Sequence, residues 1–232
     1  MTDMNLLTVF NPDVFVIGSA GLIDYFIGSN NAGKVVICLL IVMNCYALSL
    51  MFSKHNLFKK VNAKNARDEK RINDLSNIFD YDDALFSGGG SPYLTICSRA
   101  MAAARRTNDS GSIRMNYVEN AIKRALAEVG EQYESRMYWL ATIVSGAPFL
   151  GLLGTVWGVM DAFGTMESGG ATIEHLAPGV SGALLTTVAA LCVAIPIVFA
   201  YNGLLGTARS CMTKLENFAS NLADRIEIEQ KE

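Results

Sequence analysis

Residues 137–160 read MYWLATIVSGAPFLGLLGTVWGVM and contain no Asp, Glu, Lys or Arg. A helix needs about 20 predominantly apolar residues to cross a hydrocarbon core of about 30 Å. Residues 35–53 and 176–208 are two further uncharged runs of sufficient length. One such run could be a buried helix of a soluble protein, but three in a chain of 232 residues indicate a membrane protein. The predicted fold class is therefore an all-α membrane protein with three transmembrane helices.

The composition agrees with insertion into lipid, because only 18% of the residues are charged and soluble domains have about 25%. Of the 19 Lys and Arg residues, 14 lie between Lys54 and Arg136, which makes 54–136 a polar insert between the first two spans. The sequence has no bulk basic patch of the kind that would indicate nucleic-acid binding. The five cysteines are odd in number and form no CxxC pair, so neither a disulfide framework nor a metal site is expected. No cofactor is predicted.

The chain is expected to consist of seven segments, which alternate between the membrane and its two aqueous sides. They are an N-terminal extracytoplasmic, interfacial segment (1–33), transmembrane helix 1 (34–53), a cytoplasmic helical domain (54–136), transmembrane helix 2 (137–160), a periplasmic hairpin (161–176), transmembrane helix 3 (177–203) and a cytoplasmic helical tail (204–232).

The orientation follows from basic residues close to the span ends, because short cytoplasmic loops carry an excess of Lys and Arg. Lys34 alone precedes the first span, whereas seven basic residues follow it between Lys54 and Arg71. The connection 161–175 has three acidic residues and no Lys or Arg. These charges predict a periplasmic N-terminus, a cytoplasmic insert and a cytoplasmic C-terminus.

Two amphipathic segments flank the spans. Residues 14–27 are apolar but too short to cross, and Asp24 interrupts them, so we expect an interfacial helix along the membrane surface. Residues 176–208 would extend about 50 Å as a helix, which exceeds the hydrocarbon thickness. Apolar residues then continue at spacings of 3 and 4, which is a heptad-like seam. One long helix is therefore predicted to project into the cytoplasm; its seam is Ala208, Cys211, Leu215, Phe218 and Leu222.

The second and third spans each carry a stripe of small residues with one threonine. Small residues at such spacing let membrane helices approach closely, which by itself would explain the stripes. Alternatively, each stripe faces an axis where helices of a partner pack, with the threonines lining a pathway. A lone Thr can also bond its own helix, so it is weak evidence for conduction. The stripes are Pro148, Gly151, Thr155, Gly158 and Ala162, and Ala183, Thr187, Ala190 and Ala194.

The three uncharged runs contain no Asp, Glu or His. Proton relays through membranes rely on Asp, Glu or His, which bind and release the proton. If protons cross here, the titrating group must therefore come from a second polypeptide. No nucleophile–base pair or metal cluster can be assembled, so no enzymatic activity is expected. Residues 28–34 have the spacing of a phosphate-binding loop, but Val35 occupies the Ser/Thr position that would hold magnesium.

Two long motifs identify a family by resemblance. Residues 147–163, APFLGLLGTVWGVMDAF, and 177–202, APGVSGALLTTVAALCVAIPIVFAYN, resemble the second and third spans of the TolQ/ExbB/MotA family of proton-channel motor subunits. The resemblance aligns Thr155 and Thr187 with the family's pore threonines.

The resemblance also implies the surroundings and the partners of the chain. The protein would form a homopentamer in the bacterial inner membrane around a dimer of TolR/ExbD-type single-span proteins, each of which supplies an aspartate. Proton flow would pass force to a TolA- or TonB-type protein and so to the outer membrane. Pro148, Gly151, Gly158, Ala183, Ala190 and Ala194 are then expected to pack around the partner helices.

The chain departs from the family at one position. Typical TolQ and ExbB sequences have a glutamate early in the third span, where this chain has Gly182. Glu174 lies eight residues earlier, so a role of that carboxylate cannot be transferred. Two other interpretations stay open: a non-conducting membrane scaffold, and a flagellar-type stator subunit, which usually has four spans. The residues do not separate a TolQ role from an ExbB role.

Overall fold

A computed structural model describes residue 26 and residues 30–81, 90–106, 111–167 and 173–230. The predicted interfacial helix at 14–27 lies outside these residues, apart from Phe26.

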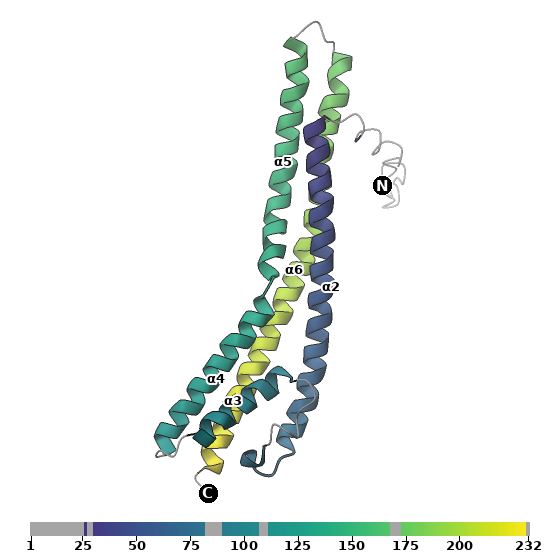
Figure 1. The fold of residues 1–232 in the computed structure, drawn as a ribbon. Helices are drawn as coiled ribbons and strands as arrows, with labels where there is room; N and C mark the ends of the chain where they lie inside the picture. Colours follow the sequence, from purple (N-terminus) through teal and green to yellow (C-terminus); the bar gives the residue numbers. More distant parts are fainter. Residues whose placement is uncertain (1–25, 27–29, 82–89, 107–110, 168–172, 231–232) are drawn as a thin grey trace, which may run out of the picture. The chain divides into compact units, whose positions relative to one another are not determined.

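The described chain is built from helices (Figure 1). Three helical segments are long and apolar enough to cross a membrane. This confirms the predicted fold class of an all-α membrane protein with three spans. The elements are α2 (Asn31–Asn73), the short 3₁₀ helix η3 (Ile78–Asp80), α3 (Pro92–Arg106), α4 (Gly111–Glu134), α5 (Met137–Glu167) and α6 (Ile173–Glu229).

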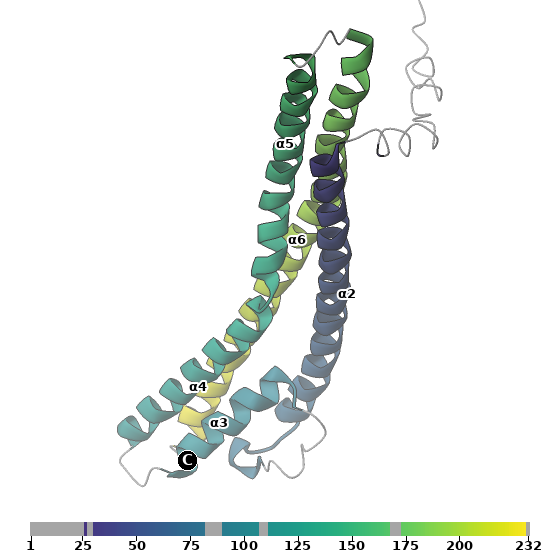
Figure 2. The same cartoon turned by 45° about the horizontal axis from the view of Figure 1, so that its top comes forward.

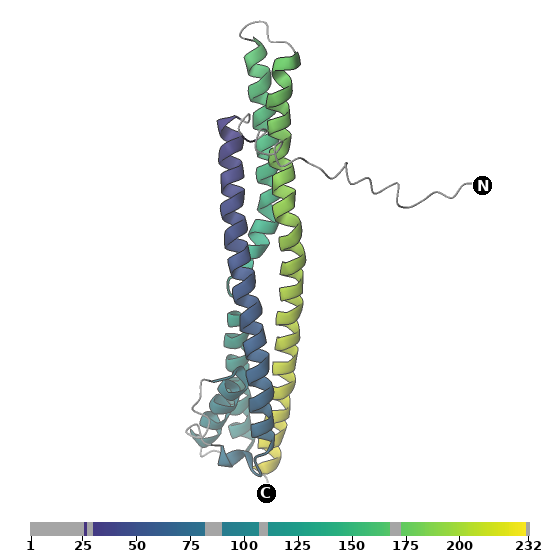
Figure 3. The ribbon, with the colours of Figure 1, turned by 90° about the vertical axis from the view of Figure 1, so that its right-hand side faces the viewer.

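The helices continue beyond the uncharged runs. Helix α5 begins at Met137 but extends to Glu167, so it continues through Asp161 and shortens the predicted connection 161–176. Helix α6 has 57 residues and continues without interruption from the third span into the predicted tail (Figure 3). Charged residues do not end a helix once it leaves lipid, because water can solvate their side chains while the backbone hydrogen bonds persist.

The chain divides into two compact units. Unit 1 contains residues 1–48 and 140–198, and thus the first part of α2, most of α5 and the first part of α6. Unit 2 contains residues 49–139 and 199–232. In unit 2, α3 packs against α4 beside the C-terminal part of α6 (Figure 2).

The core of unit 2 includes the predicted seam of α6. Its five residues from Ala208 to Leu222 are buried, and Ile226 continues the row. The ring of Tyr93 from α3 stacks on Phe218, with centroids 4.2 Å apart and an angle of 8° between the planes. The apolar seam of α6 is thus covered by helices of the same chain.

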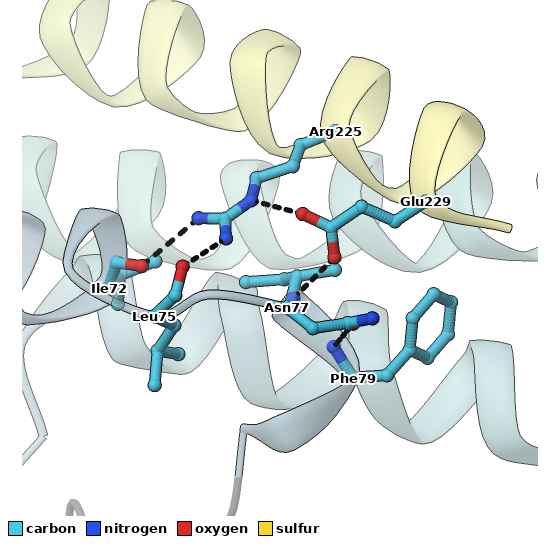
Figure 4. A network of polar contacts seen from close by, with 7 residues as sticks. Ile72, Leu75, Asn77, Phe79, Arg225 and Glu229 are labelled. Carbon is cyan, nitrogen blue, oxygen red and sulfur yellow. Dashed lines mark hydrogen bonds and ion pairs between the residues drawn. The ribbon is translucent and has the colours of Figure 1, made fainter. Parts of the chain in front are cut away.

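A polar network closes the end of α2 in unit 2 (Figure 4). Arg225 of α6 donates from Nη1 to the carbonyl oxygen of Ile72 at 3.1 Å and from Nη2 to that of Leu75 at 2.5 Å. Its Nε pairs with Glu229 at 2.5 Å, and the other oxygen of Glu229 accepts the backbone N–H of Ile78. The Ile72 carbonyl, in the last turn of α2, also accepts the Leu75 N–H at 3.3 Å. Arg225 thus adds a donor at the helix end and binds the segment that follows it.

A second anchor in unit 2 is Tyr133 in the last turn of α4. Its ring lies edge-on to Phe58 of α2, with centroids 5.7 Å apart. The residue is only 4% exposed. Burial, with a smaller contribution from the Cys211 thiol, raises the pKa of the Tyr133 phenol from 10.0 to about 12.

Replacing Arg225 by Met should destabilise unit 2 by about 1–3 kcal/mol, because part-buried carbonyls and the Glu229 carboxylate lose a charged donor. The measurement is thermal unfolding of the purified protein in detergent. Arg209→Met is the matched control, because Arg209 is exposed on the same helix. Equal unfolding temperatures for the two variants would contradict the capping role of Arg225.

The stability of the protein should fall between pH 10 and pH 12 in a way that depends on Tyr133. The phenol ionises near pH 10 in the unfolded chain but only near pH 12 in the fold, so the folded state binds more protons in this window and loses stability as the pH rises. The contribution of Tyr133 to the free energy of unfolding is complete below pH 10. It decreases by up to about 2–3 kcal/mol as the pH rises through 12. Tyr133→Phe should flatten the measured stability–pH curve, whereas Tyr117→Phe, at an exposed position of the same helix, should not. Parallel curves for wild type and Tyr133→Phe would contradict this assignment.

Candidate functional site

The candidate site lies where α5 and α6 pack against each other inside unit 1. Their contacts run in opposite directions along the two sequences, so the helices are antiparallel, and they lie side by side in Figures 1 and 3. Glycines of α5 face small side chains of α6. The contacting pairs are Gly151 with Ala190, Gly154 with Thr186, and Gly158 with Ala183.

The approach of the two helices leaves no room for a side chain at these glycines. A Cβ on Gly151 would lie 2.5 Å from the Cβ of Ala190 and 3.0 Å from the backbone Cα of Thr187. A Cβ on Gly158 would lie 2.5 Å from the Cβ of Ala183. Because helices in lipid associate through close packing and not through the hydrophobic effect, these glycines set the spacing of the pair.

Thr186 adds a hydrogen bond between the two helices. Its side chain is fully buried, and its hydroxyl lies 3.1 Å from the carbonyl oxygen of Gly151 and 2.7 Å from that of Ala183. The single hydroxyl hydrogen is therefore shared between an interhelical and an intrahelical acceptor. The sequence pattern had singled out Thr187, yet the spacing of Ala183, Thr186 and Ala190 by 3 and 4 also fits one helical face. Gly154 could have been recognised in the same way.

The two threonines predicted to line a pathway are half-buried and do not hydrogen-bond to each other in the described chain. Thr155 donates to the carbonyl oxygen of Leu152 in its own helix at 2.8 Å. The Thr187 hydroxyl is buried and has no hydrogen-bond partner among the described residues. It is thus an unused polar group within the predicted third span.

The small residues predicted to pack around partner helices make contacts within the chain. Gly151, Gly158 and Ala183 lie between α5 and α6. Pro148 is half-buried inside α5. Their packing around helices of a partner stays a prediction. Ala190 and Ala194 form a buried cluster with Ala147 of α5 and with Val36 and Leu40 of α2.

Asn30 links the start of α2 to α5 in unit 1. Its Oδ1 accepts the backbone N–H of Gly33 at 2.8 Å, as a helix cap does, and its Nδ2 donates to Asp161 at 3.3 Å. A groove of about 580 Å³ lies beside this contact and includes Trp157 in its wall. The described residues contain no group of His, Cys, Asp and Glu that could hold a metal ion.

Comparisons with known proteins identify the family of the chain and several relatives. Residues 94–217 match the family model described as the MotA/TolQ/ExbB proton channel family. The chain is 34% identical over 203 residues to the biopolymer transport protein ExbB of Xanthomonas campestris pv. campestris, covering 82% of this chain and 79% of the relative. It is 30% identical over 231 residues to ExbB of Neisseria gonorrhoeae, with 96% and 97% covered. The Tol-Pal system protein TolQ of Haemophilus influenzae is 27% identical over 189 residues, with 78% and 83% covered.

Gly151→Ala should destabilise the α5–α6 pair by about 1–3 kcal/mol, the usual cost of overpacking, because its Cβ meets backbone as well as a side chain. Thermal unfolding in detergent measures the effect. Gly146→Ala on the same helix is the control: a Cβ there meets nothing within 4 Å, and Ala favours a helix by about 1 kcal/mol over Gly. The close packing would be refuted if both variants were equally stable.

Proposed function

Because the chain belongs to the MotA/TolQ/ExbB proton channel family, we propose that it is the multi-span subunit of a TolQ/ExbB-type motor driven by the proton-motive force. It forms a proton channel with a TolR/ExbD-type single-span partner. The motor energises outer-membrane processes through a TolA- or TonB-type protein. The observation that carries the proposal is the pairing of this family match with three uncharged runs that contain no Asp, Glu or His.

The need for a partner follows from the chemistry of the spans. The three uncharged runs offer hydroxyls and small surfaces but no Asp, Glu or His, and a proton relay in lipid requires such a group. An aspartate on a partner helix would supply it. The unpartnered hydroxyl of Thr187 is a free hydrogen-bonding group within the third span, and it supports the assignment of Thr187, with Thr155, to the proton pathway.

The exposure of the spans supports assembly with further copies. In the most apolar window of each span, only 22%, 28% and 33% of the residues are buried inside the single chain. Large apolar side chains such as Phe149, Val156 and Leu184 are more than half exposed. These surfaces fit lipid, and they also fit neighbouring subunits of a homopentamer enclosing a partner dimer.

The family and the three apolar helices support a bacterial inner-membrane protein. We place the N-terminus in the periplasm and the C-terminus in the cytoplasm, because basic residues concentrate after the first span. One elementary charge that crosses the membrane releases about 2.3 kcal/mol per 100 mV, so a few protons per step suffice to rearrange a helix interface.

Thr187→Val and Thr155→Val should each reduce proton flux at least tenfold, because Val keeps the side-chain shape and removes the hydroxyl. The flux is measured in liposomes that contain the complex with its single-span partner, after the subunit ratio has been checked. Thr207→Val is the control, since Thr207 donates to Gly203 outside the central part of the third span. Full flux in both pathway variants would contradict the assignment of the two threonines to the pathway, whereas absence of flux through the wild-type complex would favour a non-conducting scaffold. A flagellar-type stator subunit would be favoured if the complex generated force only with flagellar partners and with an additional transmembrane span.

A further inference from the structure

Lys54 is a buried cation at the end of an uncharged run. It directly follows residues 35–53 in α2 and is only 5% exposed. Its Nζ donates to the backbone carbonyl oxygens of Gln132 at 3.1 Å and Tyr133 at 3.0 Å, and it lies 3.4 Å from the Ser135 hydroxyl. The same amine lies 5.9 Å from the centre of the Phe58 ring. All these groups belong to unit 2.

The carbonyls that Lys54 binds lie in the last turn of α4, and that of Gln132 also accepts the Ser135 hydroxyl at 2.8 Å. Helix α4 ends at Glu134 and α5 begins at Met137, so the last turn of α4 has no following turn to donate to it. Arg136 between the helices has a φ of 64°, in the left-handed region that a residue other than glycine seldom adopts. A cation at this point also interacts favourably with the negative, C-terminal end of the α4 dipole.

The position of Lys54 differs from the usual behaviour of a lysine at a membrane boundary. Such a lysine normally extends its ammonium group into water or toward lipid headgroups. Here the group turns inward, and burial, followed by the charge of Arg136, lowers the pKa of the Lys54 amine. The ion pairs found among the described residues do not include Lys54. A buried charge held by neutral oxygens alone is costly, so its benefit must lie in the geometry that it maintains.

We propose that Lys54 is a positioning residue that locks the break between α4 and α5 and makes it a stiff joint. Because the joint resists bending at Arg136, a movement of α5 also moves α4. The mechanical part of this inference rests on the proposed motor function, whereas the locking part does not.

The fold offers a second contact that separates the lock from overall stability. The ring of Tyr133 also packs edge-on against Phe58 of α2, and because this contact needs no donor from Lys54, we expect it to keep α4 against α2 when Lys54 is replaced. The amides on the two sides of the break report its opening. The Ser135 N–H bonds to the Glu131 carbonyl at 2.8 Å, and the Trp139 N–H bonds to the Arg136 carbonyl at 3.3 Å.

Hydrogen exchange of the purified full chain in nanodiscs, measured by mass spectrometry, tests the lock. In Lys54→Met the peptide that covers 131–140 should exchange about tenfold faster than in wild type, and peptides of α3 should be unchanged. Lys54→Arg should recover much of the protection, because it retains a charge and several donors. Lys59→Met, at an exposed position of α2, should match wild type. The lock is refuted if Lys54→Met exchanges like wild type, or if exchange rises equally throughout unit 2.

Energisation of the outer membrane in cells tests the mechanical part. Lys54→Met should assemble with its single-span partner at the wild-type ratio but lose at least tenfold in activity, while Lys59→Met keeps it. Full activity in a variant whose break exchanges fast would refute force transfer through the joint. Absence of proton flux through the wild-type complex would instead refute the proposed function, and the exchange result would still decide the lock.

Discussion

The distance between α5 and α6 is the constraint on which unit 1 depends. In lipid the hydrophobic effect does not drive helices together, so contact must come from close packing and from interhelical hydrogen bonds. Gly151, Gly154 and Gly158 permit this contact because each lacks the Cβ that would collide with α6. Thr186 then reaches the Gly151 carbonyl across the narrow gap. The same packing leaves the large apolar side chains on the outer faces, where lipid or other subunits can cover them.

Helix ends are the second recurring problem, and side chains from other helices solve it. Asn30 caps α2 and binds Asp161 of α5 in unit 1. In unit 2, Lys54 of α2 satisfies the last carbonyls of α4, and Arg225 of α6 satisfies those at the end of α2. Each contact adds a partner for backbone groups at a helix end. The polar groups of the chain thus define where its helices begin and end relative to their neighbours within each unit.

In a proton-driven motor built from this chain, the spans and the partner would supply different chemical groups. The spans supply spacing and hydroxyls, and the absence of Asp, Glu and His from the uncharged runs assigns the proton carrier to a partner. The break at Arg136 is the point at which the chain passes from α4 into α5, and it is where Lys54 acts. Gly182 is buried in α6 and contributes no carboxylate of its own.

The sequence by itself determined the helical class, the three spans and the seam of α6. These features depend on local composition and period: an uncharged run needs lipid, and residues such as Cys211 and Leu215 recur on one face of any helix. The choice of Thr186 over Thr187 as the interhelical donor was decided only by tertiary structure, because both residues border the same helical face and the register of α5 selects between them. The inward turn of Lys54 was equally hidden, since its acceptors are backbone carbonyls 78 and 79 residues away. Every residue type has a backbone carbonyl, so no pattern of side chains in the sequence predicts which carbonyls Lys54 binds.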